Sequence, residues 1–301
     1  MKLGVNLSFA VKRLPEAREW ARFVRESLGL DLVQFTFDLL DPWTPKTHRR
    51  ALAAQARRAA QDYGITIHSA FVGLAAYSYN GLLHPEQAGR QAARAWWERA
   101  IELTADLGST GLGGQLGGLS VADAARPHVA RERLEQAFQA WSELSRIAAD
   151  AGLETLYIEP TPLTREFPHT LEMSRQMASD WAGRTAIPVK YAVDVGHAIY
   201  RPLYGDNLAA SLESWLVELA DDIGLLHLQN TDGHSDSHWG WPDPRGTFDV
   251  ARFGAVVKQA GLEDRPIFIE VFYPFELADE AVLDNIKSTV AHCKAALGLS
   301  R

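Results

Sequence analysis

The 301-residue sequence has little of three things: cysteine, positive charge and long apolar runs. Its single cysteine, Cys293, cannot form an internal disulfide, which is typical of a chain kept in a reducing compartment such as the cytoplasm. The formal net charge of −8 argues against a broad basic surface, so we expect neither nucleic acid nor an anionic membrane as a partner. No apolar run approaches the roughly 20 residues that span a bilayer. Asn6 and Ser8 interrupt the apolar N-terminal stretch, which we interpret as a strand rather than a signal peptide.

What the sequence does have is a regular alternation of short apolar runs and longer amphipathic segments. The short runs, rich in β-branched and aromatic residues, predict strands over 3–9, 32–38, 65–71, 109–117, 154–160, 189–197, 223–229 and 266–272. The longer segments predict helices over 14–28, 46–63, 84–108, 130–151, 168–184, 206–220, 250–261 and 278–297. Eight strands alternating with eight helices predict an α/β fold, a (β/α)8 TIM barrel forming one domain over residues 1–301. The loop over 230–249 is long enough to indicate a function.

Each of the last four predicted strands ends near an ionisable side chain. In ETLYIEPTP, residues 154–162, an apolar run leads into Glu159 and two prolines, and the next three strands carry Asp194, His227 and Glu270. Parallel strands are buried on both faces and should be apolar throughout. A buried carboxylate needs a partner or a metal, and the active sites of TIM barrels lie at these strand ends. We therefore predict a divalent-cation site, with Mn²⁺ favoured and Mg²⁺ or Co²⁺ as alternatives.

Each of these residues, taken alone, also has a structural explanation. Glu159 could pair with an arginine or lysine, His227 could be a hydrogen-bonded core histidine, and Asp194 could cap the following turn. Four such coincidences in four successive strands are improbable, so the set as a whole favours a metal over structural ion pairs.

The order Glu159, Asp194-Val-Gly-His197, His227 and Glu270 resembles the xylose isomerase-like barrel superfamily, in particular its D-tagatose 3-epimerase-like branch, over nearly the whole chain. The segments VNLSFAVKR and IHSAFVGL are also similar to bacterial epimerases of a tetrulose phosphate. The resemblance implies metal-dependent epimerisation at C3 of a small ketose or ketose phosphate through a cis-enediolate. It implies that Glu159 and Glu270 are both metal ligands and acid/base catalysts, and that Asp194 and His227 are ligands only.

The same resemblance suggests residues that contact the substrate. His197 would either bond a substrate oxygen or orient a metal ligand. Related epimerases carry an arginine shortly after the histidine of strand seven, whereas here the run from His227 to His234 holds Gln229 and no arginine. The substrate-binding candidates are His68 at the end of strand 65–71, Gln115, Arg165, His197, Gln229 and Arg245. For a phosphorylated substrate, Arg201, Arg245 and the Lys12-Arg13 pair are candidate anchors, although each is also typical of a solvated surface charge.

Several functions remain open at this point. An aldose–ketose isomerase or an inosose-type dehydratase would use the same site. A nuclease resembling endonuclease IV would need a larger, histidine-rich set of zinc ligands and a DNA-binding surface, which the acidic balance disfavours. A sugar-binding barrel without activity is disfavoured by the presence of both glutamates. Apolar surface at Trp96 and Trp97 would favour a homo-oligomer.

Overall fold

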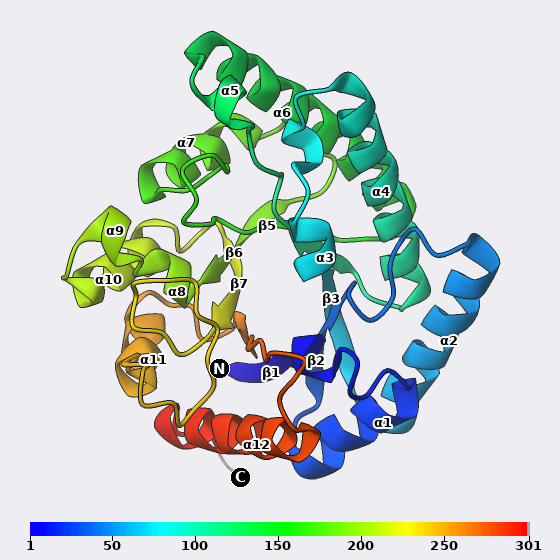
Figure 1. Cartoon of the computed structure of the whole chain (residues 1–301), viewed down its shortest axis with the longest axis vertical. Helices are drawn as coiled ribbons and strands as arrows, with labels where there is room; N and C mark the ends of the chain where they lie inside the picture. Colours follow the sequence, from blue (N-terminus) through cyan, green and yellow to red (C-terminus); the bar gives the residue numbers. More distant parts are fainter. Residues whose placement is uncertain (300–301) are drawn as a thin grey trace. The chain divides into compact units, whose positions relative to one another are not determined.

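The computed structural model describes residues 1–299, with residues 208–210 as backbone only (Figure 1). Within them, eight strands form a closed parallel barrel in sequence order, which confirms the predicted (β/α)8 fold. The strands are β1 (Lys2–Asn6), β2 (Leu32–Thr36), β3 (Thr66–Phe71), β4 (Gly111–Gly114), β5 (Thr155–Ile158), β6 (Val189–Asp194), β7 (Ile223–Leu228) and β8 (Pro266–Ile269).

A helix follows each strand, close to the predicted limits. The main helices are α1 (Ala17–Arg22), α2 (Lys46–Asp62), α4 (Gln87–Asp106), α6 (Pro127–Asp150), α7 (Leu171–Trp181), α10 (Leu208–Glu218), α11 (Val250–Gln259) and α12 (Asp279–Ala296). A π-helical stretch, Phe23–Ser27, continues α1. The short helices are η1 (Leu7–Ala10), α3 (Leu74–Tyr77), η3 (Gly81–Leu83), α5 (Val121–Ala124), α8 (Val195–Ala198) and α9 (Arg201–Tyr204). No helix within residues 1–299 is long and apolar enough to cross a bilayer.

All the strands except β3 end earlier than predicted, and in β1 and β6 the last residue of the strand caps the helical turn that follows. The Asn6 side chain accepts a hydrogen bond from the backbone N–H of Ser8, so η1 begins where the predicted strand 3–9 should continue. Asp194 likewise caps α8, which occupies the end of the predicted strand 189–197. A side-chain acceptor offers these backbone N–H groups an alternative to the strand ladder. The residues of interest thus lie at the point where strand becomes helix.

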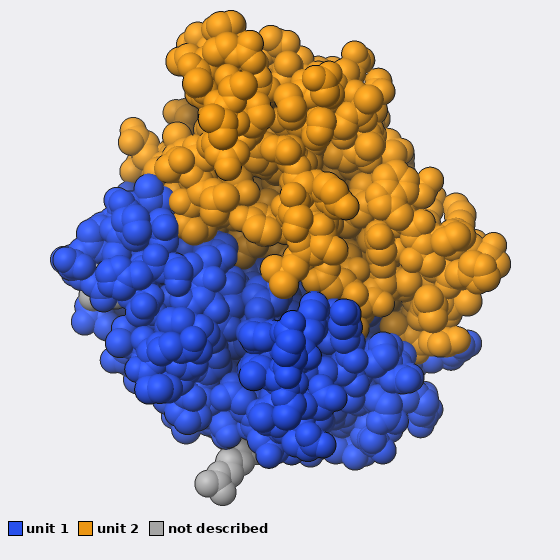
Figure 2. Space-filling model, viewed as in Figure 1, with its two compact units in different colours: residues 1–35, 58–67, 193–301 blue, residues 36–57, 68–192 orange. Residues whose placement is uncertain are grey.

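The chain divides into two compact units, coloured separately in Figure 2. The first comprises residues 1–35, 58–67 and 193–301, and the second comprises residues 36–57 and 68–192. Asp194, His227 and Glu270 belong to the first unit, and Glu159 belongs to the second. That residues 1–301 act as one domain stays a prediction.

The second unit has an aromatic core that corrects one expectation. Trp96 and Trp97 are 9% and 4% exposed, so they are not the apolar surface expected of them. The ring of Trp97 lies edge-on to Trp141, with centroids 4.7 Å apart, and Trp96 lies edge-on to Phe37 at 5.4 Å. These tryptophans therefore stabilise the packing of α4, and a homo-oligomer stays a prediction that they do not support.

In the first unit, strand register brings three polar side chains to one level. Val5 of β1 pairs with Ile269 of β8, and Ile269 pairs with Leu228 of β7. The next residue along the chain in each case is Asn6, Glu270 and Gln229, so these three lie one residue beyond the last register pairs of β8 with β1 and β7.

Candidate metal centre

Three predicted ligands lie together in the first unit, and we call them the ligand cluster: Asp194, His227 and Glu270. Their side chains are buried, and their ligand atoms all lie within 4.8 Å of one another. Nδ1 of His227 is 3.0 Å from Oε2 of Glu270. With Glu159, which is buried after β5, they make up a set of four residues with the donor types needed to hold a metal ion.

The two oxygens of Asp194 have different surroundings. Oδ1 accepts hydrogen bonds from the backbone N–H groups of Gly196 (2.6 Å) and His197 (3.1 Å) and from Nε2 of Gln229 (2.8 Å). Oδ2 is buried and accepts no hydrogen bond. Capping the following turn and offering a free oxygen are therefore roles of two different atoms. An orphaned buried carboxylate oxygen is costly unless a cation binds it.

Glu270, directly after β8, is held at both of its carboxylate oxygens. Oε1 accepts from Nδ2 of Asn6 (2.8 Å), which also donates to Oε1 of Gln34 (2.7 Å), and Oε2 faces His227. Burial raises the pKa of Glu270, but the neighbouring imidazoles, His227 first, outweigh it, so the pKa lies below its usual value. Glu270 is therefore an ionised, oriented carboxylate, which suits both a ligand and a base.

The ligand cluster fits a divalent cation chemically. It offers carboxylate oxygens and one imidazole, with the partnerless Oδ2 of Asp194 among them. Oxygen-rich sets of this kind suit Mg²⁺ and Mn²⁺, and neither thiolate nor thioether takes part.

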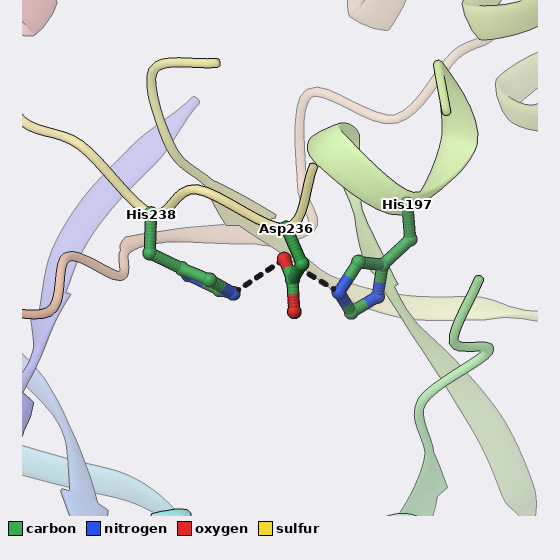
Figure 3. A group of neighbouring side chains, drawn as sticks. All are labelled: His197, Asp236 and His238. Atoms are coloured by element: carbon green, nitrogen blue, oxygen red, sulfur yellow. Dashed lines mark ion pairs between the residues drawn. The ribbon is translucent and has the colours of Figure 1, made fainter. Parts of the chain in front are cut away.

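A second group of acid and imidazole lies in the same unit, and we call it the loop cluster: His197, Asp236 and His238 (Figure 3). His197 comes from α8, and the other two come from the loop after β7. Oδ1 of Asp236 is 3.1 Å from Nε2 of His197 and 2.9 Å from Nε2 of His238. Burial lowers the pKa of His238, but the charge of Asp236 outweighs it and raises that pKa above its ordinary value.

Gln229 connects the two clusters. Its Nε2 donates to Oδ1 of Asp194 (2.8 Å) and to Oδ1 of Asp236 (3.2 Å), and its Oε1 accepts from the backbone N–H of His238 (2.5 Å). The amide lies so close to Gly196 that a Cβ there would be 2.6 Å from Nε2. The glycine of Asp194-Val-Gly-His197 thus makes room for the bridge. Substrate contact by Gln229 stays a prediction, and its side chain lies between Asp194 and the loop.

The long loop, expected to be functional, is fixed where it meets the loop cluster. Asn230 and Trp239 pair as an antiparallel bridge, with N–O distances of 2.9 and 3.0 Å, which returns the chain to the end of β7. His238 has a φ of 46°, a left-handed conformation that is uncommon for histidine. Its Nδ1 lies 3.2 Å from the carbonyl oxygen of Glu270, and its ring lies against Phe272. Backbone and ring are thus both held in place.

Three of the predicted substrate-binding residues, Gln115, His68 and Arg165, belong to the second unit. Gln115, after β4, donates through Nε2 to Oε2 of Glu159. His68 is the third of six residues of β3 and not its last, as the sequence had suggested; its Nδ1 is 3.2 Å from Oγ of Ser69. Arg165 donates through Nη1 to the carbonyl oxygen of Leu119 (2.5 Å). Substrate contact by these residues stays a prediction.

The candidate anchors for phosphate in the first unit already have partners. Arg245 is exposed, forms a two-pronged ion pair with Asp243 and stacks on Trp239. Arg201 pairs with Asp206 and donates to the carbonyl oxygen of Asp232. Arg13 is 3.2 Å from Asp279, and Lys12 lies over the ring of Phe275. Binding a phosphate would require each side chain to exchange or share these contacts.

Sequence reasoning missed four residues of the site: Asn6, Gln34, Asp236 and His238. Asn6 and Gln34 are buried polar residues on apolar parallel strands, the same signal that identified the metal ligands, but they carry no charge. Asp236-Ser-His238 sits in a loop with no periodicity to interpret. The loop cluster also weakens one argument against a nuclease, which had assumed too few histidines, while the acidic balance still opposes it.

Comparisons with known proteins now decide the family. The model of the xylose isomerase-like TIM barrel family matches residues 22–289. The chain belongs to this family. D-erythrulose 1-phosphate 3-epimerase of Brucella abortus (strain 2308) is 28% identical over 97% of this chain and 94% of that protein.

Solved structures agree with this assignment. A crystal structure from Rhodospirillum rubrum ATCC 11170, which carries the provisional name xylose isomerase, is 39% identical with a TM-score of 0.94 and covers 100% of both chains. D-psicose 3-epimerase from Clostridium cellulolyticum H10 has a TM-score of 0.69 at 16% identity over 99% of this chain and 97% of that one, which supports the fold alone. The homologues are sugar epimerases and isomerases, so the family is one of enzymes, and the epimerase family predicted from the sequence is confirmed.

Proposed function

We propose that this protein is a divalent metal-dependent epimerase that inverts C3 of a small ketose or ketose phosphate. The observation that carries the proposal is the buried ligand cluster, in which Oδ2 of Asp194 is left without a partner beside His227 and an ionised Glu270. The relative named for D-erythrulose 1-phosphate favours a four-carbon ketose phosphate as substrate.

Four residues would hold the ion: Glu159, Asp194, His227 and Glu270. Glu159 is supported as the fourth ligand by its burial at the end of β5 and by its donor type. Mn²⁺ is the ion that we propose, since carboxylates outnumber the single imidazole. When bound, such an ion supplies Lewis acidity that polarises the ketose and lowers the pKa of the proton at C3.

The two glutamates would carry the proton chemistry. Glu270 removes the C3 proton, because its carboxylate is ionised and is oriented by Asn6 through Oε1. Glu159, oriented by Gln115, returns a proton to the opposite face of the resulting cis-enediolate, which inverts the centre. In the reverse direction the two residues exchange roles. Asp194 and His227 bind the ion and move no proton.

Aldose–ketose isomerisation is the alternative, favoured by the name of the Rhodospirillum rubrum protein. The same pair of carboxylates would then lie on either side of C2 and C1. The two reactions differ in which carbon of the substrate exchanges its hydrogen, so one experiment separates them.

The test is hydrogen exchange followed by NMR. The enzyme, supplied with Mn²⁺, is incubated in D₂O with ketoses and ketose phosphates of four to six carbons, including D-erythrulose 1-phosphate; the metal is then removed with chelating resin before spectra are recorded. Deuterium at C3 together with the C3 epimer is the expected result. Deuterium at C1 or C2 with an aldose product would establish the isomerase instead. No exchange with any substrate, with or without metal, would refute both reactions.

A further inference from the structure

We propose that Gln34 and Ser8 are positioning residues for the carboxylate of Glu270, Gln34 through the amide of Asn6 and Ser8 through the backbone of Val271. The inference rests on the proposed function, because it concerns the residue to which that function assigns the base. It goes further, because it places the control of the base on β1, η1 and β2, which carry none of the four proposed metal ligands.

Gln34 and Asn6 lie side by side in the barrel. They are register partners in the parallel pairing of β1 with β2, so their side chains leave the same face of the sheet. Gln34 is fully buried, and Asn6 is 2% exposed. Residues of parallel strands are normally apolar, and a buried amide costs free energy unless its hydrogen bonds are satisfied. Two amides at one level of neighbouring strands therefore indicate a role beyond packing.

Three hydrogen bonds fix the plane of the Asn6 amide. Its Oδ1 accepts from the backbone N–H of Ser8 (2.9 Å), so Nδ2 points the other way. Nδ2 donates to Oε1 of Gln34 (2.7 Å) and to Oε1 of Glu270 (2.8 Å). A primary amide has one carbonyl acceptor and two donor hydrogens in one plane, so fixing the oxygen and one hydrogen sets the direction of the other. Gln34 thereby directs the second N–H of Asn6 toward the carboxylate.

A contact from η1 holds the backbone next to Glu270. Oγ of Ser8 donates to the carbonyl oxygen of Val271 at 2.9 Å. Because β8 ends at Ile269, Val271 lies beyond the strand, where the ladder no longer fixes the chain. Both the side chain of Glu270 and the backbone that follows it are thus held from one side of the barrel. An error of about 1 Å in the position of a catalytic group can cost about 10²-fold in rate.

The test separates positioning from general stability. Gln34→Met keeps the length of the side chain but removes the acceptor for Nδ2 of Asn6. Ser8→Ala removes the hydroxyl and keeps the backbone N–H that bonds Asn6. Ser174→Ala is the matched control, because Oγ of this buried serine also donates to a backbone carbonyl oxygen, that of Thr170, at 2.9 Å. Circular dichroism confirms that each variant is folded.

Two properties are measured, and one of them does not depend on activity. Steady-state kinetics at saturating Mn²⁺, with the substrate found in the exchange experiment, give kcat and KM; crystal structures of wild type and variants grown without metal give the position of Glu270. We expect Gln34→Met to lower kcat by about 10–100-fold and to change KM by less than about two-fold. Its Glu270 carboxylate should lie about 1 Å or more from the wild-type position. Ser8→Ala should lower kcat by about two- to ten-fold. Ser174→Ala should match wild type in both measurements.

Wild-type kcat in both Gln34→Met and Ser8→Ala would overturn the proposal. A change confined to KM, or a slowed Gln34→Met whose Glu270 has not moved, would overturn it as well. If Gln34→Met does not fold, Ser8→Ala decides alone by the same two measurements. The outcome is separate from that of the proposed function. If no substrate exchanges its hydrogen, the function fails and the position of Glu270 still decides this inference, whereas an active epimerase with an unchanged Gln34→Met variant removes this inference alone.

Discussion

The ligand cluster and the loop cluster use the same residue types in opposite proportions. The ligand cluster joins two carboxylates, Asp194 and Glu270, to one imidazole and leaves a carboxylate oxygen without a partner. The loop cluster joins one carboxylate, Asp236, to two imidazoles. In the loop cluster, burial raises the pKa of Asp236 but the charge of His238 outweighs it, so Asp236 is ionised and balanced by imidazolium.

The two clusters differ in whether their own side chains can balance the buried negative charge. A proton on His238 can neutralise Asp236, so the charges of the loop cluster balance among its own side chains. One imidazolium cannot neutralise two buried carboxylates, so the charge balance of the ligand cluster supports the proposed cation. Burial follows the same division, since the ligand cluster is closed and Asp236 is partly exposed.

The largest effect is expected from removing the base in the ligand cluster. Glu270→Gln keeps the size of the side chain and its bond from Asn6 but cannot take a proton. We expect kcat for the epimerase to fall by about 10²–10⁴-fold, measured by the appearance of the C3 epimer. Glu276→Gln, an exposed glutamate shortly after β8, is the control and should leave kcat unchanged. Wild-type turnover by Glu270→Gln would contradict the assignment of the base.

The next effect is the loss of stabilisation by metal. In the wild type, Mn²⁺ at 100 times its dissociation constant should raise the free energy of unfolding by about 2.7 kcal/mol. Asp194→Asn removes the partnerless oxygen, so the increase in Tm on adding Mn²⁺ should largely disappear. Asp232→Asn, which alters an aspartate whose Oδ1 caps the backbone N–H of His234, should keep the increase. An equal rise in Tm for Asp194→Asn and wild type would show that the ion binds elsewhere.

The fold and the ligand cluster could be predicted because the signal was local. Glu159, Asp194, His227 and Glu270 each interrupt an apolar run, and strand order alone brings strand ends to one side of a barrel. The two explanations weighed for Asp194, cap and ligand, proved compatible, because each uses a different oxygen. A sequence gives residue types and not atoms, so it could not make that distinction.

The loop cluster and the burial of Trp97 could not be predicted, because both depend on contacts between residues far apart in the sequence. The pairing of Asn230 with Trp239 and the hydrogen bonds of Gln229 hold Asp236 and His238 in place. No periodicity or motif in the sequence predicts those contacts. The burial of Trp97 depends on Trp141, 44 residues further along the chain. Amphipathic pattern predicted the helix, but not which large side chains another helix would cover.

A smaller effect on metal binding is expected from Gln229, the residue that joins the two clusters. Gln229→Met keeps the length of the side chain but removes the donor to Asp194 and Asp236 and the acceptor for the N–H of His238. Loss of such supporting bonds typically weakens metal binding by about 10–100-fold. Titration calorimetry with Mn²⁺ should show a lowered affinity in Gln229→Met. Gln259→Met, on the exposed face of α11, is the control. An unchanged affinity for Mn²⁺ in Gln229→Met would show that the amide does not support metal binding by the ligand cluster.

The smallest effect is expected at Arg245, an exposed residue of the same loop as Asp236 and His238. Its guanidinium is exposed and already bound to Asp243 and Trp239. Surface substitutions away from buried contacts usually have small effects. Arg245→Ala should therefore change KM for the substrate found in the exchange experiment by less than about two-fold. Asp243→Ala serves as the control, because it frees the guanidinium. A KM raised about ten-fold or more by Arg245→Ala, for a phosphorylated substrate and not for the free sugar, would assign the phosphate to this arginine. Positive charge for the substrate would then come from the exposed surface of the loop after β7.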